Sequence, residues 1–176
     1  MRIKPLIKEK EIEKAIKFLV HSVEECCRNG KPLILHSLRV GFVAIQLQLS
    51  QEAIITGFLH DLVEDTNCDF KTIQDCFGLK VANFVKIFTQ EPIEDYQQRW
   101  QVLLAKIKAK GKEAMLLKIV DANDNLAYVP FIRDGKYLQE TFWKYNFLEQ
   151  ELKPFLRKNK IFQDYQESIQ CLKTKL

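Results

Sequence analysis

The sequence predicts an all-α fold in which one compact multi-helix bundle covers residues 1–176. Apolar residues recur at the helical spacing of three and four along most of the chain, and no long segment shows the period of two that is typical of strands. Only 6 glycines and 5 prolines interrupt the 176 residues, which disfavours a β fold rich in turns. With 47% hydrophobic residues, the chain can bury a sizeable core without disulfides.

Capping residues divide this pattern into helices. Ser50 and Asp69 are expected N-caps, because each precedes a helical pattern and can accept a hydrogen bond from the first turn. Gly78 is an expected helix stop, because glycine readily adopts the conformation that ends a helix. The helices are expected over 9–29, 36–49, 51–64, the short stretch between Asp69 and Gly78, 79–90, 94–110, 112–128, 136–157 and 160–173.

Charge and cysteine content limit the function classes. The 27 basic and 23 acidic residues give a net charge of +4 and form no basic arm, so a nucleic-acid partner is disfavoured and a small anionic substrate fits. The five cysteines are odd in number and lack CxxC spacing, which favours a reduced, cytoplasmic protein. We expect no signal peptide and no membrane span, because no apolar run approaches about 18 residues. A homo-oligomer stays open.

The segment GFLHDLVEDT contains a dense group of ionisable residues. On a continuous helix His60 and Glu64 share one face at i,i+4, and Asp61 and Asp65 share the next. Clustered carboxylates beside an imidazole repel one another unless a cation lies among them. The spacing alone leaves two interpretations open, a metal site or the solvated acidic end of a helix.

Two further segments carry isolated candidates. Asp121 lies in MLLKIVDANDNL, where Lys118, Asp124 and Asn125 extend a polar stripe beside apolar residues. This stripe is interpreted either as an exposed helix face or as a carboxylate ligand with an amide one turn later. His36 follows the apolar run PLIL, and by itself it is expected to be a packed core histidine.

Taken together, these residues resemble the HD-domain metal phosphohydrolases, in which one histidine, then a His-Asp pair and then an aspartate follow on helices. Here the pair comes 24 residues after the first histidine and the last aspartate 60 residues after the pair. GFLHDLVEDT is similar to the ALLHDVVEDT-type segment of the guanosine tetraphosphate (alarmone) hydrolases, RNGKPLILHSLRVG to their first-histidine segment, and LLKIVDANDNL to their K-L-A-D-R-L-H-N-M segment. The resemblance covers about 20–130, and the small size resembles the stand-alone hydrolases of this type.

This resemblance implies roles for individual residues. Two imidazoles and two carboxylates would hold one divalent metal, usually manganese in this family: His36, His60, Asp61 and Asp121. Two acidic residues would position and deprotonate the attacking water: Glu64 and Asp65. Substrate contacts are implied for Arg28, Lys31, Asn125, Lys136 and Thr141. The implied reaction releases the 3′-pyrophosphate from guanosine 3′,5′-bis(diphosphate) (ppGpp), the nucleotide of the stringent response.

The sequence departs from the family pattern near the implied site. Ser37 stands where proline is usual, Ala122 and Ala127 stand where basic residues are common, and Asp124 replaces a histidine or tyrosine. These changes make the site more acidic, which disfavours a highly charged alarmone. Three alternatives stay open: an HD phosphohydrolase of another small nucleotide, such as a nucleoside monophosphate or a 3′-phosphorylated cofactor, a non-catalytic module that senses a nucleotide, and an RNA- or DNA-binding helical protein.

Overall fold

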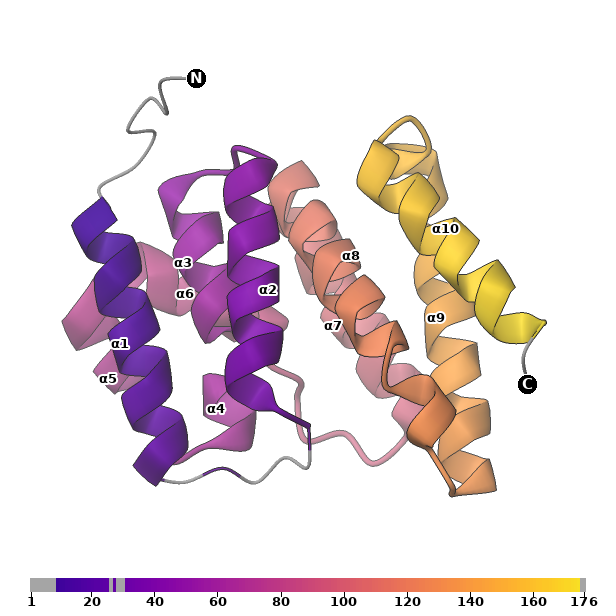
Figure 1. Ribbon diagram of the computed structural model, residues 1–176, viewed down its shortest axis with the longest axis horizontal. Helices are drawn as coiled ribbons and strands as arrows, with labels where there is room; N and C mark the ends of the chain where they lie inside the picture. Colours follow the sequence, from indigo (N-terminus) through magenta and orange to yellow (C-terminus); the bar gives the residue numbers. More distant parts are fainter. Residues whose placement is uncertain (1–8, 26, 28–30, 175–176) are drawn as a thin grey trace. The chain divides into compact units, whose positions relative to one another are not determined.

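The computed structural model describes residues 9–25, 27 and 31–174, and every regular element in these ranges is a helix (Figure 1). The predicted all-α class is therefore confirmed. Arg28, one of the expected substrate contacts, lies outside the described residues. The backbone separates into two compact units, which we call the first unit, residues 1–89, and the second unit, residues 90–176. That the whole chain forms a single domain stays a prediction.

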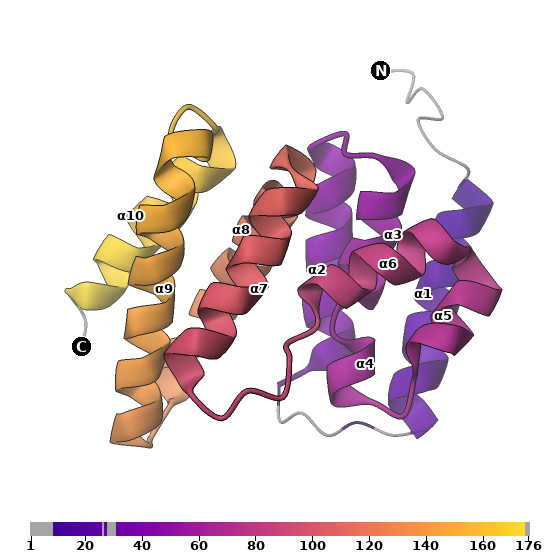
Figure 2. The same cartoon turned by 180° about the vertical axis from the view of Figure 1, so that it is seen from behind.

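In the first unit, a largely buried helix lies among the others. The helices are α1 (Glu9–Glu25), α2 (Leu33–Gln46), α3 (Gln51–Leu59), α4 (Leu62–Asp65), α5 (Phe70–Phe77) and α6 (Leu79–Phe88). Helix α3 packs against α1, α2 and α6 (Figures 1 and 2). Every residue from position 53 to 60 is buried, because α3 has neighbours around most of its circumference.

The predicted caps of the first unit are confirmed. The Ser50 hydroxyl accepts a hydrogen bond from the backbone N–H of Ala53 at 3.3 Å, and the Asp69 carboxylate accepts one from that of Thr72 at 2.7 Å. The hydrogen bonds from Thr72 lower the pKa of Asp69. Gly78 has a φ of 84° and ends α5, as its position in the sequence predicted.

The close approach of α2 and α3 depends on one glycine. A Cβ atom at Gly41 of α2 would lie 2.3 Å from the ring of Phe58 on α3, a distance that packed atoms do not adopt. With hydrogen in place of a side chain, the Phe58 ring lies directly against the α2 backbone. Because α2 carries His36 and α3 leads into His60, this contact brings two histidines distant in sequence near each other.

The predicted helix over 51–64 is wrong in one respect, because it is interrupted at His60 and Asp61. Nδ1 of the His60 side chain lies 3.0 Å from the backbone carbonyl of Gly57. In a continuous helix that carbonyl would accept the backbone N–H of Asp61. The His60 side chain thus contacts a carbonyl of the helical ladder at the point where the regular helix is interrupted. His60 and Glu64 therefore do not share a face of one regular helix.

In the second unit, α8 packs against each of the other helices. The elements are α7 (Tyr96–Lys110), α8 (Lys112–Leu126), a 3₁₀ turn η1 (Val129–Phe131), α9 (Gly135–Leu156) and α10 (Lys160–Lys173). Helix α8 packs against α7, α9 and α10. Lys118 and Asp121 are buried, with 7% and 3% of their surfaces exposed, so the interpretation of their stripe as an exposed helix face is wrong for both residues.

The helix ends mostly agree with the sequence pattern to within a turn. Helix α2 begins at Leu33 rather than at 36, because the apolar run after Pro32 forms its first turn and Leu33 is buried. Helix α7 begins at Tyr96 because the Asp95 carboxylate accepts a hydrogen bond from the Gln98 backbone and caps the helix there. None of the described helices combines the length and the apolar character that crossing a membrane requires.

Candidate functional site

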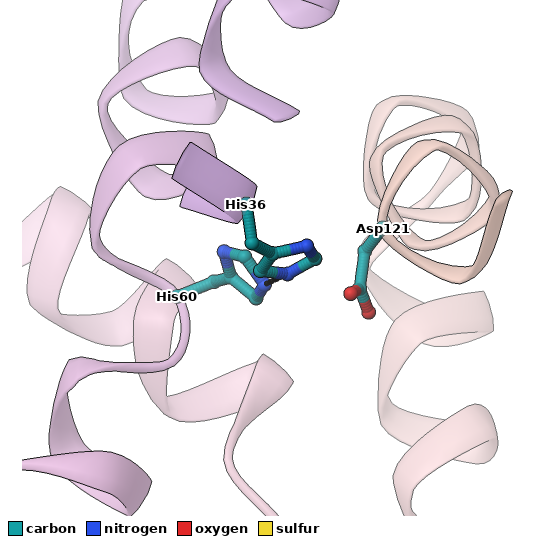
Figure 3. A group of neighbouring side chains, drawn as sticks. All are labelled: His36, His60 and Asp121. Carbon is teal, nitrogen blue, oxygen red and sulfur yellow. Dashed lines mark hydrogen bonds between the residues drawn. The ribbon is translucent and has the colours of Figure 1, made fainter. Parts of the chain in front are cut away.

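Two buried histidines of the first unit face each other. His36 comes from α2 and His60 from the interruption after α3, and their exposed fractions are 0% and 2% (Figure 3). Their Nε2 atoms lie 3.2 Å apart. Two nitrogens at this distance either share a proton or bind the same cation. His36 is thus buried, as expected of a core histidine, but its ring nitrogen is directed at a second imidazole.

The protonation of His60 follows from its backbone partner. A carbonyl oxygen only accepts hydrogen bonds, so Nδ1 of His60, 3.0 Å from the Gly57 carbonyl, carries the proton of the neutral ring. The lone pair then lies on Nε2, the atom that faces His36. A histidine that donates one N–H to a backbone carbonyl and offers the other nitrogen is typical of metal-binding sites.

The carboxylate of Asp61 lies against both imidazoles. Its Oδ1 is 3.2 Å from Nε2 of His60, and its Oδ2 is 3.4 Å from Nε2 of His36. The Lys31 ammonium donates to Oδ2 at 2.7 Å. The Asp61 and Lys31 side chains are 16% and 17% exposed, so this group of charges lies at the margin of the buried region. Three of the predicted metal ligands therefore meet in the first unit, next to one of the predicted substrate contacts.

The side chains of two adjacent residues converge where the helix is interrupted. On a continuous helix, consecutive side chains point about 100° apart and do not meet. His60 and Asp61 are consecutive, yet their Nε2 and Oδ1 atoms approach to 3.2 Å. The interruption at His60 and Asp61 thus coincides with the point at which the two side chains approach each other.

The predicted acid–base pair, Glu64 and Asp65, lies on α4, directly after the His60–Asp61 pair. The side chains of Glu64 and Asp65 are half-buried, and the backbone N–H of Asp65 donates to the carbonyl of Asp61 at 2.9 Å. This hydrogen bond keeps Asp65 one helical turn after Asp61. The two carboxylates are therefore carried by the turn that begins at the metal-ligand candidate.

In the second unit, Asp121 of α8 is held at both of its carboxylate oxygens. Oδ1 accepts a hydrogen bond from Nδ2 of Asn125 at 2.6 Å, and Oδ2 accepts one from Nζ of Lys118 at 2.7 Å. Figure 3 also draws this side chain. Sequence reasoning assigned Lys118 no role. The available indication was a lysine three residues before an aspartate inside an otherwise apolar segment.

A tyrosine near Asp121 is kept neutral. Burial raises the pKa of Tyr145 well above its ordinary value, and the negative charge of Asp121 raises it further. The hydroxyl of Tyr165 donates to the backbone carbonyl of Tyr145 at 3.0 Å, which ties α10 to α9. Asp121 therefore lies in surroundings that disfavour additional negative charge.

The remaining two predicted substrate contacts lie on α9, and one is exposed whereas the other is buried. The Lys136 side chain is 85% exposed and pairs with Glu140 at 3.8 Å, beside a pocket of about 300 Å³ that Tyr96 also lines. Thr141 is 2% exposed, and its hydroxyl has no hydrogen-bond partner among the described residues. The structure therefore does not place Lys136 and Thr141 together.

Comparison with known families decides the identity of the domain. The model of the HD domain family matches residues 15–121, which is more than half of the chain. The chain belongs to the HD-domain family. The match contains the His-Asp pair at 60 and 61 and ends at Asp121, and the predicted membership is confirmed.

Relatives of this HD domain carry the name that the sequence motifs suggested. It is 29% identical over 131 residues to a guanosine-3′,5′-bis(diphosphate) 3′-pyrophosphohydrolase of Spiroplasma citri and 31% identical over 135 residues to one of Aquifex aeolicus. The aligned parts cover 70% and 72% of this chain but only 18% and 19% of those proteins. The predicted resemblance to alarmone hydrolases is therefore confirmed, and the chain spans about a fifth of the length of these two relatives.

A solved structure shares the fold of this HD domain. It is described as a metazoan ortholog of SpoT that hydrolyses ppGpp, and it superposes with a TM-score of 0.73 over 91% of this chain and 94% of its own at 18% identity. At that identity the likeness establishes the fold. Within this HD domain, the buried His36, His60 and Asp121 each offer one ligand atom of a kind that divalent cations bind.

Proposed function

We propose that this HD domain hydrolyses guanosine 3′,5′-bis(diphosphate) and releases the 3′-pyrophosphate with the help of a bound divalent metal, Mn²⁺. The observation that carries the proposal is the meeting of His36, His60 and Asp61 within a matched HD domain. The names of the relatives supply the substrate.

The donor set suits a divalent cation. Two ligands that each lie about 2.1 Å from one ion at a right angle are about 3 Å apart, and the two Nε2 atoms are 3.2 Å apart. We assign the cation to His36, His60, Asp61 and Asp121, a mixed nitrogen and oxygen set that suits Mn²⁺. When bound, the metal lowers the pKa of a water molecule and draws charge from the phosphoryl oxygens.

The residues of the chain divide the remaining tasks. Glu64 and Asp65 orient the attacking water and accept its proton as its oxygen bonds to phosphorus. The bond between the sugar 3′ oxygen and that phosphorus breaks, the 3′ oxygen takes up a proton to become a hydroxyl, and the pair of phosphates, which now carries the oxygen of the water, is released as pyrophosphate. Lys31 neutralises phosphate charge from its position beside Asp61. Contacts to the rest of the nucleotide are assigned to Arg28, Asn125, Lys136 and Thr141.

The test is turnover by the purified protein with Mn²⁺. Guanosine 3′,5′-bis(diphosphate), a nucleoside monophosphate and a 3′-phosphorylated dinucleotide cofactor are compared, and phosphate and pyrophosphate are measured separately. Pyrophosphate from the first substrate alone supports the proposal. Phosphate from one of the others, with no pyrophosphate from the first, would show that this is an HD phosphohydrolase of another nucleotide.

Variants separate an enzyme from a nucleotide sensor. Glu64→Gln and Asp65→Asn are expected to abolish turnover while Mn²⁺ stays bound, because neither side chain is assigned to the metal. Asp121→Ala is expected to lose both turnover and Mn²⁺ binding. Nucleotide binding without turnover, unchanged in Glu64→Gln, would instead indicate a sensing module.

The proposed setting is the cytoplasm, and the proposed partner is a small nucleotide. Both are supported by the odd number of cysteines without CxxC spacing and by the modest net charge of +4.

A further inference from the structure

The Asp121 carboxylate is tied on both sides by residues of its own helix. Lys118, three residues earlier, donates to Oδ2 at 2.7 Å, and Asn125, four residues later, donates to Oδ1 at 2.6 Å. Residues three and four apart lie next to each other on a helix surface. Each carboxylate oxygen therefore has a fixed donor, and rotation of the group about its last bond would break both hydrogen bonds.

Lys118 is itself held in place. Only 7% of the residue is exposed, and its ammonium lies 4.9 Å from the centre of the Trp100 ring on α7. A buried lysine is costly unless its charge is compensated. The carboxylate of Asp121 and the face of Trp100 provide that compensation, and together they fix a side chain that is usually flexible.

The geometry points to Lys118 and Asn125 as positioning residues that hold the Asp121 carboxylate in one orientation for the metal. This inference rests on the proposed function, in which Asp121 is a metal ligand. It gives Lys118 a role that the sequence analysis did not assign, and it gives the Asn125 amide a role toward Asp121 in addition to the proposed nucleotide contact.

A positioning role and a purely electrostatic role of Lys118 predict opposite effects when its ammonium group is removed. If Lys118 were only a nearby positive charge, its removal would tighten the binding of a cation, because like charges repel. If Lys118 orients the ligand, its removal loosens binding. Partners that orient metal ligands change affinity by about 10–100-fold when they are removed.

The experiment measures the Mn²⁺ dissociation constant of the full chain by calorimetry, without nucleotide. Lys118→Met is expected to weaken Mn²⁺ binding about 10-fold or more. Lys118→Arg keeps a charged donor, so it is expected to retain most of the affinity of the unchanged protein. Lys144→Met is the matched control, because the Lys144 ammonium lies 5.3 Å from the same Trp100 ring. It removes an equal charge and should leave binding unchanged or slightly tighter.

The outcomes distinguish the positioning role of Lys118 from the assignment of Asp121 as a metal ligand. Unchanged or tighter binding in Lys118→Met, with binding lost in Asp121→Ala, overturns the positioning role and leaves the metal site intact. Normal binding in Asp121→Ala overturns the metal assignment itself. If Lys118→Met does not fold, as judged by its unfolding transition without metal, Asn125→Ala tests the other donor and is expected to weaken binding in the same direction.

Discussion

At the scale of single residues, one hydrogen bond of His60 fixes the tautomer of its ring. Nδ1 donates to the Gly57 carbonyl at the end of α3, and this leaves the lone pair of the ring on Nε2, opposite His36. The ligand chemistry of His60 is therefore set by a backbone group of the preceding turn. Other buried polar groups nearby are not satisfied in this way.

Ser37 is one of those groups. It is 1% exposed, and within the part of the chain that the structure describes its hydroxyl has no hydrogen-bond partner, although Ser37 adjoins His36 in sequence. An unpaired buried hydroxyl costs about 1–3 kcal/mol. We expect Ser37→Ala to raise the free energy of unfolding by up to about 1 kcal/mol, because part of that cost is removed. Urea denaturation measures the change.

Thr66→Val is the control for this measurement. The Thr66 hydroxyl donates to the Leu62 carbonyl at 2.7 Å and accepts from the Cys68 backbone at 3.0 Å. Removing it should lower the free energy of unfolding by about 1–2 kcal/mol. Greater destabilisation by Ser37→Ala than by Thr66→Val would contradict the prediction.

Cys68 is expected to be the slow thiol at neutral pH. Burial raises its pKa to about 11, and the charges of Asp69 and Cys76 contribute in the same direction. Since only the thiolate reacts, alkylation by iodoacetamide at pH 8 should be slower at Cys68 than at the exposed Cys171, and its rate should rise as the pH approaches 11. Peptide mass spectrometry gives both rates, and equal rates at pH 8 would refute the raised pKa.

At the scale of elements, the contact between α2 and α3 positions the two histidines. Gly41 lets the Phe58 ring lie against the α2 backbone, and His36 is in the same helix as Gly41. The separation of the two helices therefore controls the distance between the imidazoles. Gly41 lowers the intrinsic helix propensity of α2, since glycine is a poor helix former. Its contribution is the close packing of α2 against α3.

Gly41→Ala is therefore expected to destabilise the protein. The added Cβ would lie 2.3 Å from the Phe58 ring, and overpacking of this kind costs about 1–3 kcal/mol, which exceeds the gain of about 1 kcal/mol in helix propensity. Mn²⁺ binding should weaken as α2 moves away from α3. Thermal unfolding and calorimetry measure the two effects.

Gly135→Ala is the matched control for this substitution. A Cβ at Gly135, the first residue of α9, would meet no atom within 4 Å, so the same change should leave stability unchanged or slightly raised. Replacing the obstructing ring by a smaller side chain, with Phe58→Leu in the Gly41→Ala background, should restore part of the Mn²⁺ affinity. Loss of stability in both glycine variants alike would mean that packing against Phe58 is not the cause.

At the scale of the whole molecule, the assigned ligands run from residue 36 to residue 121. The HD-domain match extends over the same range, past the boundary between the two compact units at residues 89 and 90. A ligand that binds the folded chain and not the unfolded one stabilises the folded chain by mass action.

Mn²⁺ should therefore raise the melting temperature. At about 100 times the dissociation constant the stabilisation is about 2.7 kcal/mol, and EDTA should reverse it. The same titration of Asp121→Ala should give no shift in a scanning fluorimetry experiment. An equal shift in that variant would show that the metal stabilises the protein through other residues.

The sequence by itself determined the helices, their caps and the order of the candidate ligands. Ser50, Asp69 and Gly78 act on their own first or last turns, so a local pattern is enough to predict them. The order of histidines and aspartates also needs no coordinates, and it led to the family that the comparison with known domains established.

Only the tertiary structure decided which polar side chains are buried and what they contact. The polar stripe of α8 has the same spacing whether it faces water or protein, and the packing of α7, α9 and α10 around that helix makes Lys118 and Asp121 a buried pair. The pairing of Lys31 with Asp61 joins residues 30 apart, and no helical period relates them. Such contacts depend on how helices pack, which a local pattern does not record.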